Sequence, residues 1–166
     1  MELRHSRFIW HYDIPPKFAA FGFLVGRKKI LTIDSLQKRS MILPNICLLC
    51  MHNEEIVDHL LMHCFFVRLI WADILGRFQI LRSFLELVDL LLSAWHGVIL
   101  GKEKKLLWSL SLLAIWWEVW EELNARCFNN ISKVAEGSSR RARALVIEWT
   151  SCTPKLTGCN LDFLGL

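Results

Sequence analysis

The sequence predicts a mainly α-helical protein, and three observations lead to this fold class. Apolar residues recur at spacings of three and four positions over several long stretches, which is the period of one face of an α-helix. Proline or glycine lies next to several of these stretches, where helices commonly begin or end. Hydrophobic residues make up 54% of the chain and charged residues only 22%, a balance that excludes an intrinsically disordered protein.

The first two predicted helices lie before residue 40. Residues 17–26, with the sequence KFAAFGFLVG, follow two prolines and end at a glycine, so they predict a first helix. Thr32 is expected to cap a short second helix over residues 33–39. Ile33 and Leu36 should then point inward.

The remaining predicted helices are longer. They cover roughly residues 57–78, 83–95 and 104–127, and a last helix runs from residue 130 or 132 to residue 149. In the 104–127 helix, we expect the glutamates to face solvent on the side opposite a buried stripe. That stripe consists of Trp108, Leu112, Ile115, Trp116 and Leu123.

Length and hydropathy bound the class of protein. At 166 residues the chain has the size of one ordinary domain, and its eight tryptophans suggest that some apolar surface faces a partner. We interpret residues 84–100 and 106–117 as buried helices rather than membrane spans, because the first contains two acids and the second is shorter than about 18 residues. The N-terminus lacks the apolar segment of a secretory signal. We therefore expect an intracellular protein, in the nucleus or cytoplasm, and no membrane partner.

Basic residues concentrate near the two ends of the chain, although the net charge is only +4. Residues 1–40 hold eight lysines and arginines against three acids, and a second basic cluster, SSRRAR, spans residues 138–143. Two basic ends suit contact with a polyanion, whereas a charge run by itself is usually a solvated face.

Residues 47–64 contain three of the six cysteines and three of the six histidines. Cys47 and Cys50 have the Cys-x2-Cys spacing, at which a tight turn directs two thiolates onto one metal ion. In a reducing compartment such a cluster indicates metal ligands before disulfides. A catalytic nucleophile would instead need one activated thiol beside a base. The pattern predicts a structural Zn²⁺ site with His59, at the start of a helix, as the third ligand.

The residues themselves leave the fourth ligand open between His63 and Cys64. His63 lies four residues after His59, so both project from one helical face, and this geometry slightly favours His63. Cys64 lies five residues after His59, about 140° around an ideal helix, and reaches the ion only if the helix is loosened or starts late. His52 follows Cys50 too closely to bind the same ion, so we expect it in an exposed turn.

Several motifs around this cluster point to a known family. A tryptophan and Pro-Pro-Lys precede an aromatic-rich helix, and an arginine ends the next helix; Cys-x2-Cys, Glu-x-x-x-His-Leu, a cysteine and a tryptophan follow. With these motifs, residues 9–71 resemble the zinc-binding domain that follows reverse transcriptase in plant non-LTR (LINE-type) retrotransposons. The segment IWWEVWEELNARCFNN is similar to the Trp-rich helix that often trails that domain, which commonly ends near Glu-Arg-Asn-x-Arg-x-Phe. The matching residues in the domain are Trp10, Pro15, Pro16, Lys17, Thr32, Leu36, Arg39, Cys47, Cys50, Glu55, His59, Leu60, Cys64 and Trp71.

The resemblance implies that Cys64 rather than His63 is the fourth ligand, because the family has a cysteine here and often a histidine just before it. The expected ligand set is therefore Cys47, Cys50, His59 and Cys64. Glu55 and Asp58 flank the site; they could steady His59 by a hydrogen bond, but we interpret them as surface acids. The expected organisation is a reverse-transcriptase-type zinc-binding domain over residues 9–75, a helical extension over 80–150 and a loose tail over 151–166.

From this site and resemblance we expect a noncatalytic zinc-binding module that contacts the backbone of RNA or DNA. Four protein ligands leave no open position on the ion, and the scattered acids do not form a polymerase site. One alternative is a zinc-stabilised helical scaffold that docks a protein partner through the Trp-rich helix. Another is a degenerate remnant without activity, which the departures from the family at Leu48 and Leu123 suggest. The candidate nucleic-acid-binding residues are Lys17, Arg27, Lys28, Lys29, Lys38 and Arg39.

Overall fold

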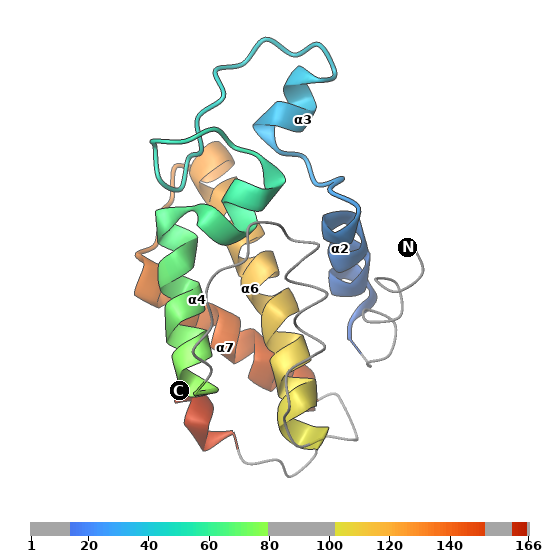
Figure 1. The fold of residues 1–166 in the computed structure, drawn as a ribbon, viewed down its shortest axis with the longest axis vertical. Coiled ribbons are helices and arrows are strands. Elements are labelled where there is room, and N and C mark those ends of the chain that lie inside the picture. Colours follow the sequence, from blue (N-terminus) through green and yellow to red (C-terminus); the bar gives the residue numbers. More distant parts are fainter. Residues whose placement is uncertain (1–13, 80–101, 152–160, 166) are drawn as a thin grey trace.

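The computed structural model describes residues 14–79, 102–151 and 161–165, and within these ranges the chain forms helices and no strand (Figure 1). The prediction of a mainly α fold is confirmed. The long helix α6 contacts α2, α4 and α7, and α7 also contacts α4. Their bounds are α2 Pro16–Gly26, α4 Phe65–Arg77, α6 Lys102–Asn129 and α7 Ala135–Ser151. Helix α3 (Ile33–Gln37) lies at one end of the molecule, beyond the end of α2 (Figure 1).

Helix α6 provides much of the core. All five residues of the stripe predicted from its sequence are buried, from Trp108 to Leu123. The expectation that its glutamates face solvent is wrong for Glu118 and Glu122, whose side chains are 0% exposed. The reason is tertiary: Lys133 approaches from the segment before α7, and its ammonium lies 2.8 Å from a Glu118 oxygen. Burial of a carboxylate is tolerated when such a partner is supplied.

Aromatic side chains join α2 to the C-terminal helices. Proline at the first helical position and glycine at the last bound α2, as its sequence predicts. The Phe18 ring centroid lies 4.7 Å from that of Trp117 on α6 and 4.5 Å from that of Trp149 on α7. Phe21 makes an edge-to-face contact with Trp117 at 5.3 Å. Such pairs contribute about 0.5–1.5 kcal/mol each beyond the buried area, so they fix the position of α2.

Helix α3 is shorter than the sequence indicates, and it buries less. None of the residues of α3 is fully buried, and the side chains of Ile33 and Leu36, which were expected to point inward, are half-buried. Thr32 occupies the N-cap position and is itself buried, but its hydroxyl bonds to the carboxylate of Asp34 rather than to a backbone N–H. The first N–H of α3 therefore needs an acceptor from elsewhere in the chain.

The C-terminal part of the described chain packs against α4 and α7. Helix α7 begins at Ala135, later than the residue 130 or 132 that the sequence suggests. Arg143 on α7 is buried, and it donates hydrogen bonds to the carbonyl oxygens of Leu164, at 2.6 Å, and Gly165. Leu164 lies in the short helix η3 (Asp162–Leu164), and its side chain is buried.

Some sequence predictions fall on residues outside the described ranges. They are the helix over 83–95 and most of the tail after residue 151. The boundaries of the predicted domains stay a prediction. Within the residues that the structure describes, no helix combines the length and the apolar character that crossing a membrane requires.

Replacing Ile115 by alanine should lower the free energy of unfolding by about 2–5 kcal/mol, because the fully buried side chain leaves a cavity. The matched control is Phe128→Ala on the same helix, where the ring is 76% exposed. It should change the free energy by less than about 0.5 kcal/mol. Urea denaturation of both variants measures the difference, and equal losses would place the core on the wrong face of α6.

Candidate metal centre

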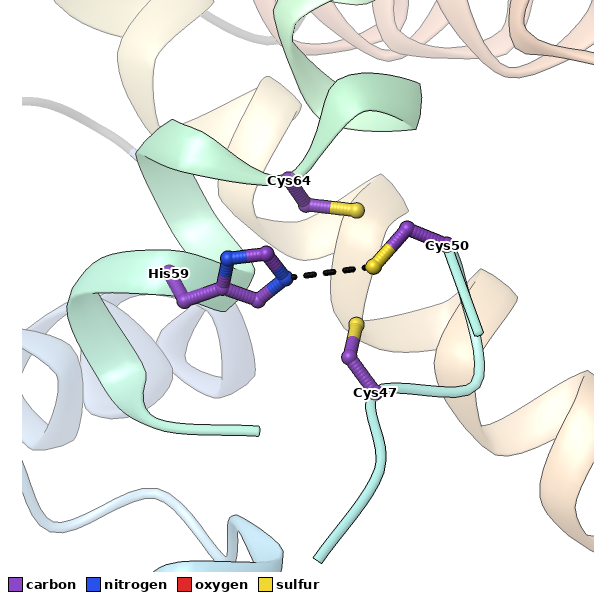
Figure 2. Close-up of side chains that lie close together, drawn as sticks. All are labelled: Cys47, Cys50, His59 and Cys64. Carbon is purple, nitrogen blue, oxygen red and sulfur yellow. Dashed lines mark hydrogen bonds between the residues drawn. The ribbon is translucent and has the colours of Figure 1, made fainter. Parts of the chain in front are cut away.

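Three thiols and one imidazole converge on a common point (Figure 2). The ligand atoms of Cys47, Cys50, His59 and Cys64 all lie within 4.8 Å of one another, and the Cys50 sulfur is 3.4 Å from Nε2 of His59. In a tetrahedral zinc site with bonds of about 2.3 Å, thiolates lie about 3.8 Å apart. The four side chains are therefore close enough to hold one metal ion.

The first two cysteines lie on a tight turn. The N–H of Met51 donates to the Cys47 carbonyl at 2.7 Å, and the N–H of Cys47 donates to the Asn53 carbonyl at 2.7 Å. Met51 closes the turn with a φ of 58°, in the left-handed region. The N–H groups of Leu49 and Cys50 point at the sulfur of Cys47. These bonds place both thiols on the same side of the turn, as the Cys-x2-Cys spacing predicts.

His59 and Cys64 come from a helix that is interrupted between them. The sequence predicts one continuous helix over residues 57–78, and this prediction is wrong at Cys64. His59–His63 form a single π-helical turn, η1, in which the N–H of Cys64 donates to the His59 carbonyl at 2.7 Å. Cys64 itself has an extended backbone, with φ −55° and ψ 130°, and α4 starts directly after it. The wider π turn brings residues five apart onto one side, so Cys64 joins His59 in the cluster.

The other two histidines of the segment lie outside the cluster. His63 and His52 are both exposed, and His52 bonds through Nδ1 to the Cys50 carbonyl in the turn. The slight geometric preference for His63 assumed an ideal helix of 3.6 residues per turn. The structure does not have that helix here, which is why Cys64 lies near His59.

Close contact between two of the thiols shifts their pKa values in opposite directions. A hydrogen bond with Cys64, together with burial, raises the pKa of Cys47, and the same bond lowers the pKa of Cys64. The N–H groups of Val67 and Phe66 at the start of α4 also lower the pKa of Cys64. Burial, with His63 nearby, lowers the pKa of His59, so its imidazole is in the neutral form that binds metal ions.

Residues 2–71 match the family model described as zinc-binding in reverse transcriptase. The matched segment contains all four residues of the cluster, together with α2, α3, η1 and the first half of α4. This family is a zinc-binding region and not the catalytic polymerase domain. No curated protein and no solved structure gives a match to the chain. The match and the geometry together indicate a zinc-binding module.

Within the matched segment, Glu55 connects the cluster to α3. The interpretation of Glu55 as a surface acid is wrong, since its side chain is buried. Its Oε1 accepts the N–H of Ile33 at 3.1 Å, which supplies the missing acceptor at the start of α3. Its own N–H donates to the side chain of Asn45 at 2.7 Å. Asp58, the other flanking acid, is half-buried and pairs with Lys28.

Arg126 on α6 is a site residue that spacing alone did not identify. Its guanidinium donates to the carbonyls of Leu48 and Leu49, the two residues between the first two cysteines. It lies outside the matched segment. The one signal for it in the sequence is the resemblance of α6 to the family's trailing helix, whose pattern has an arginine at this position.

Three of the six candidate nucleic-acid-binding residues lie together. Lys28, Lys38 and Arg39 line a cleft of about 500 Å³ between α3 and the residues just before η1. Two of them already have acidic partners: the Lys28 and Lys38 ammonium groups lie 2.8 Å from carboxylate oxygens of Asp58 and Asp34.

The other three candidates lie on α2 or in the turn after it. The Lys17 ammonium is 4.6 Å from the centroid of the Phe18 ring, and the Arg27 guanidinium is 4.6 Å from that of Phe23. Lys29 is exposed. The structure thus gathers only half of the predicted set around one cleft.

Replacing Glu55 by alanine should lower the free energy of unfolding by about 1 kcal/mol, because the first N–H of α3 loses its acceptor. Glu55→Gln keeps an acceptor oxygen at the same place and should lose less than half as much. Burial raises the pKa of Glu55, which lessens the cost of replacing its carboxylate by a neutral amide. Urea denaturation measures the free energy of unfolding of both variants. Equal losses would contradict the role of Glu55 as the acceptor at the start of α3.

Proposed function

We propose that Cys47, Cys50, His59 and Cys64 bind a structural Zn²⁺ ion. The observation that supports this most strongly is the convergence of three thiols and one imidazole within 4.8 Å. Thiolate and imidazole donors in a tetrahedral set of four suit zinc better than the harder cations that prefer oxygen. A bound ion would neutralise the crowded sulfurs and join the turn to η1, so that binding energy becomes folding energy. With four protein ligands the ion has no open position, and its role is structural.

The proposal extends to the origin and partner of the module. The motifs from Trp10 to Trp71 resemble those of the plant LINE-type domain, and the match to a reverse-transcriptase zinc-binding family supports an origin in a reverse-transcribing element. In such an element the module contacts the backbone of RNA or DNA, with RNA preferred. Lys29 and Arg39 are exposed and have no ion pair among the described residues. Lys28 and Lys38 already pair with the half-buried carboxylates of Asp58 and Asp34, which a phosphate has to displace.

A protein partner is the second candidate. Four apolar side chains in residues 41–46 are exposed, including Ile42, which is completely so. A loop of this kind is typical of a surface that a partner covers. The tryptophans Trp108 and Trp116 of α6 are buried in the core, so the exposed loop is a better contact surface than the Trp-rich helix.

Metal analysis of the purified protein should find about one zinc per chain. Cys64→Ser should lose most of this zinc, because it removes one of four donors. His63→Ala is the matched control, since the neighbouring side chain is exposed, and it should keep the metal. Zinc that is absent from the wild type, or lost from His63→Ala and retained in Cys64→Ser, would contradict the proposal.

Nucleic-acid contact should depend on the cleft cations and on salt. We expect the variant K28E/K29E/R39E to bind single-stranded RNA at least about 10-fold more weakly, with a salt slope smaller by about 2, since each phosphate contact contributes about 0.7. The variant K104E/K105E/R140E has the same net charge and changes exposed residues elsewhere.

Fluorescence anisotropy from 50 to 200 mM salt measures both variants beside the wild type. The control should retain the wild-type affinity within a factor of about two. Equal losses in the two variants would show that only net charge matters. Binding by the wild type that does not change with salt would exclude phosphate contacts altogether.

A further inference from the structure

We propose that Arg126 is a positioning residue of the metal site, which acts on the Cys-x2-Cys turn from helix α6. The inference rests on the proposed metal binding. It extends the site beyond the segment that matches the family model, because Arg126 lies in the C-terminal half of the chain. Its consequence is that metal affinity depends on a side chain more than 75 residues away from the turn in sequence.

The contact is made with the middle of the turn. Nη1 of Arg126 lies 3.2 Å from the carbonyl oxygen of Leu48 and 3.1 Å from that of Leu49. These are the two residues between Cys47 and Cys50. One nitrogen therefore bridges two successive carbonyl groups of the loop that carries two ligands.

The two carbonyls belong to the peptide units whose N–H groups face a ligand sulfur. The Leu48 carbonyl shares a planar peptide unit with the N–H of Leu49, and the Leu49 carbonyl shares one with the N–H of Cys50. Both N–H groups lie so that they lower the pKa of the Cys47 thiol, against the rise caused by Cys64 and burial. Because N–H and C=O point in opposite directions in a trans peptide, Arg126 and the sulfur hold the same two planes from opposite sides. Bonds in series through one peptide unit also polarise and strengthen one another.

Further hydrogen bonds and a ring contact fix the guanidinium of Arg126. Nε donates to Glu122 at 2.7 Å, and Nη2 donates to the Lys133 carbonyl at 3.0 Å. The group lies 4.7 Å from the centroid of the Phe66 ring on α4. The Glu122 carboxylate is buried and also accepts the N–H of Lys133 at 2.8 Å. A guanidinium fixed by these contacts can present a donor to the turn in one orientation, which the single ammonium of a lysine cannot reproduce.

The experiment measures zinc affinity of the full chain by competition with a chromophoric chelator, and the ligand-field spectrum of the Co²⁺ form. The variants are Arg126→Met and Arg126→Lys. The control is Leu145→Ala, which removes a buried side chain from α7 and destabilises the fold while every residue of the turn stays unchanged. Circular dichroism sets a temperature at which all of them are folded.

We expect Arg126→Met to bind zinc about 10-fold or more weakly than the wild type, with an altered Co²⁺ spectrum. For Arg126→Lys, the logarithm of the zinc affinity should fall by more than half of the decrease seen in Arg126→Met. If the methionine variant does not fold, the lysine variant still tests the inference, because lysine keeps a positive charge beside Glu122. Leu145→Ala should show the wild-type affinity and spectrum.

A wild-type affinity in both Arg126 variants would overturn this inference and leave the proposed zinc site intact. An equal loss in Leu145→Ala would also overturn it, because the effect would then reflect general stability. A wild-type chain that binds no zinc would overturn the proposed function and this inference together.

Discussion

The convergence of three sulfurs and one imidazole is the constraint on which the local structure depends. To bring Cys64 beside His59, the chain gives up regular α-helical hydrogen bonding for one π turn and then leaves the helix for one residue. That interruption decides where α4 begins, since its first N–H groups point at the Cys64 sulfur. On the opposite side, the turn from Cys47 to Cys50 has its own N–H groups directed at the Cys47 sulfur. Helix termini and turns that face sulfur in this way stabilise negative charge.

Buried charge extends this organisation into the C-terminal half. The Glu122 carboxylate accepts hydrogen bonds from Nε of Arg126 and from the backbone N–H of Lys133. The Lys133 ammonium donates to the Glu118 carboxylate. The network ties α6 to the segment before α7 and, through Arg126, to the turn at residues 48 and 49. Removing one partner from such a network costs far more than the network adds, because a charge is left buried and unpaired. The network therefore links the part of the chain that matches the family model to helix α6.

Features that depend on local periodicity, such as helix bounds and buried helix faces, can be predicted from the sequence. Features that depend on contacts between distant residues cannot. The stripe from Trp108 to Leu123 follows from helix period alone, and the bounds of α2 follow from its proline and glycine. The buried Glu118 could not be predicted in this way, because the partner that makes its burial tolerable comes from another part of the chain.

The site shows the same division. The Cys-x2-Cys spacing and the position of His59 were sufficient to predict a cluster, but the choice between His63 and Cys64 depended on the helix type. Ideal helical geometry favours His63, whereas the π turn brings Cys64 to His59. The family resemblance pointed to the cysteine because it carries information about the fold that spacing lacks. Glu55 and Arg126 were missed as site residues because they act through backbone groups far away in sequence.

Two residues close to His59 in sequence also contact the elements that carry the basic side chains of the cleft. Glu55, four residues before His59, holds the start of α3, and Asp58, directly before His59, pairs with Lys28. Helix α3 in turn carries Asp34, the partner of Lys38. Carboxylates within this arrangement offset part of its positive charge, so the proposed polyanion would have to displace them before it gained contacts with these lysines. A fixed geometry reduces the entropy lost in that exchange. The proposed structural ion would order η1 and so affect the cleft through Glu55 and Asp58 without touching it.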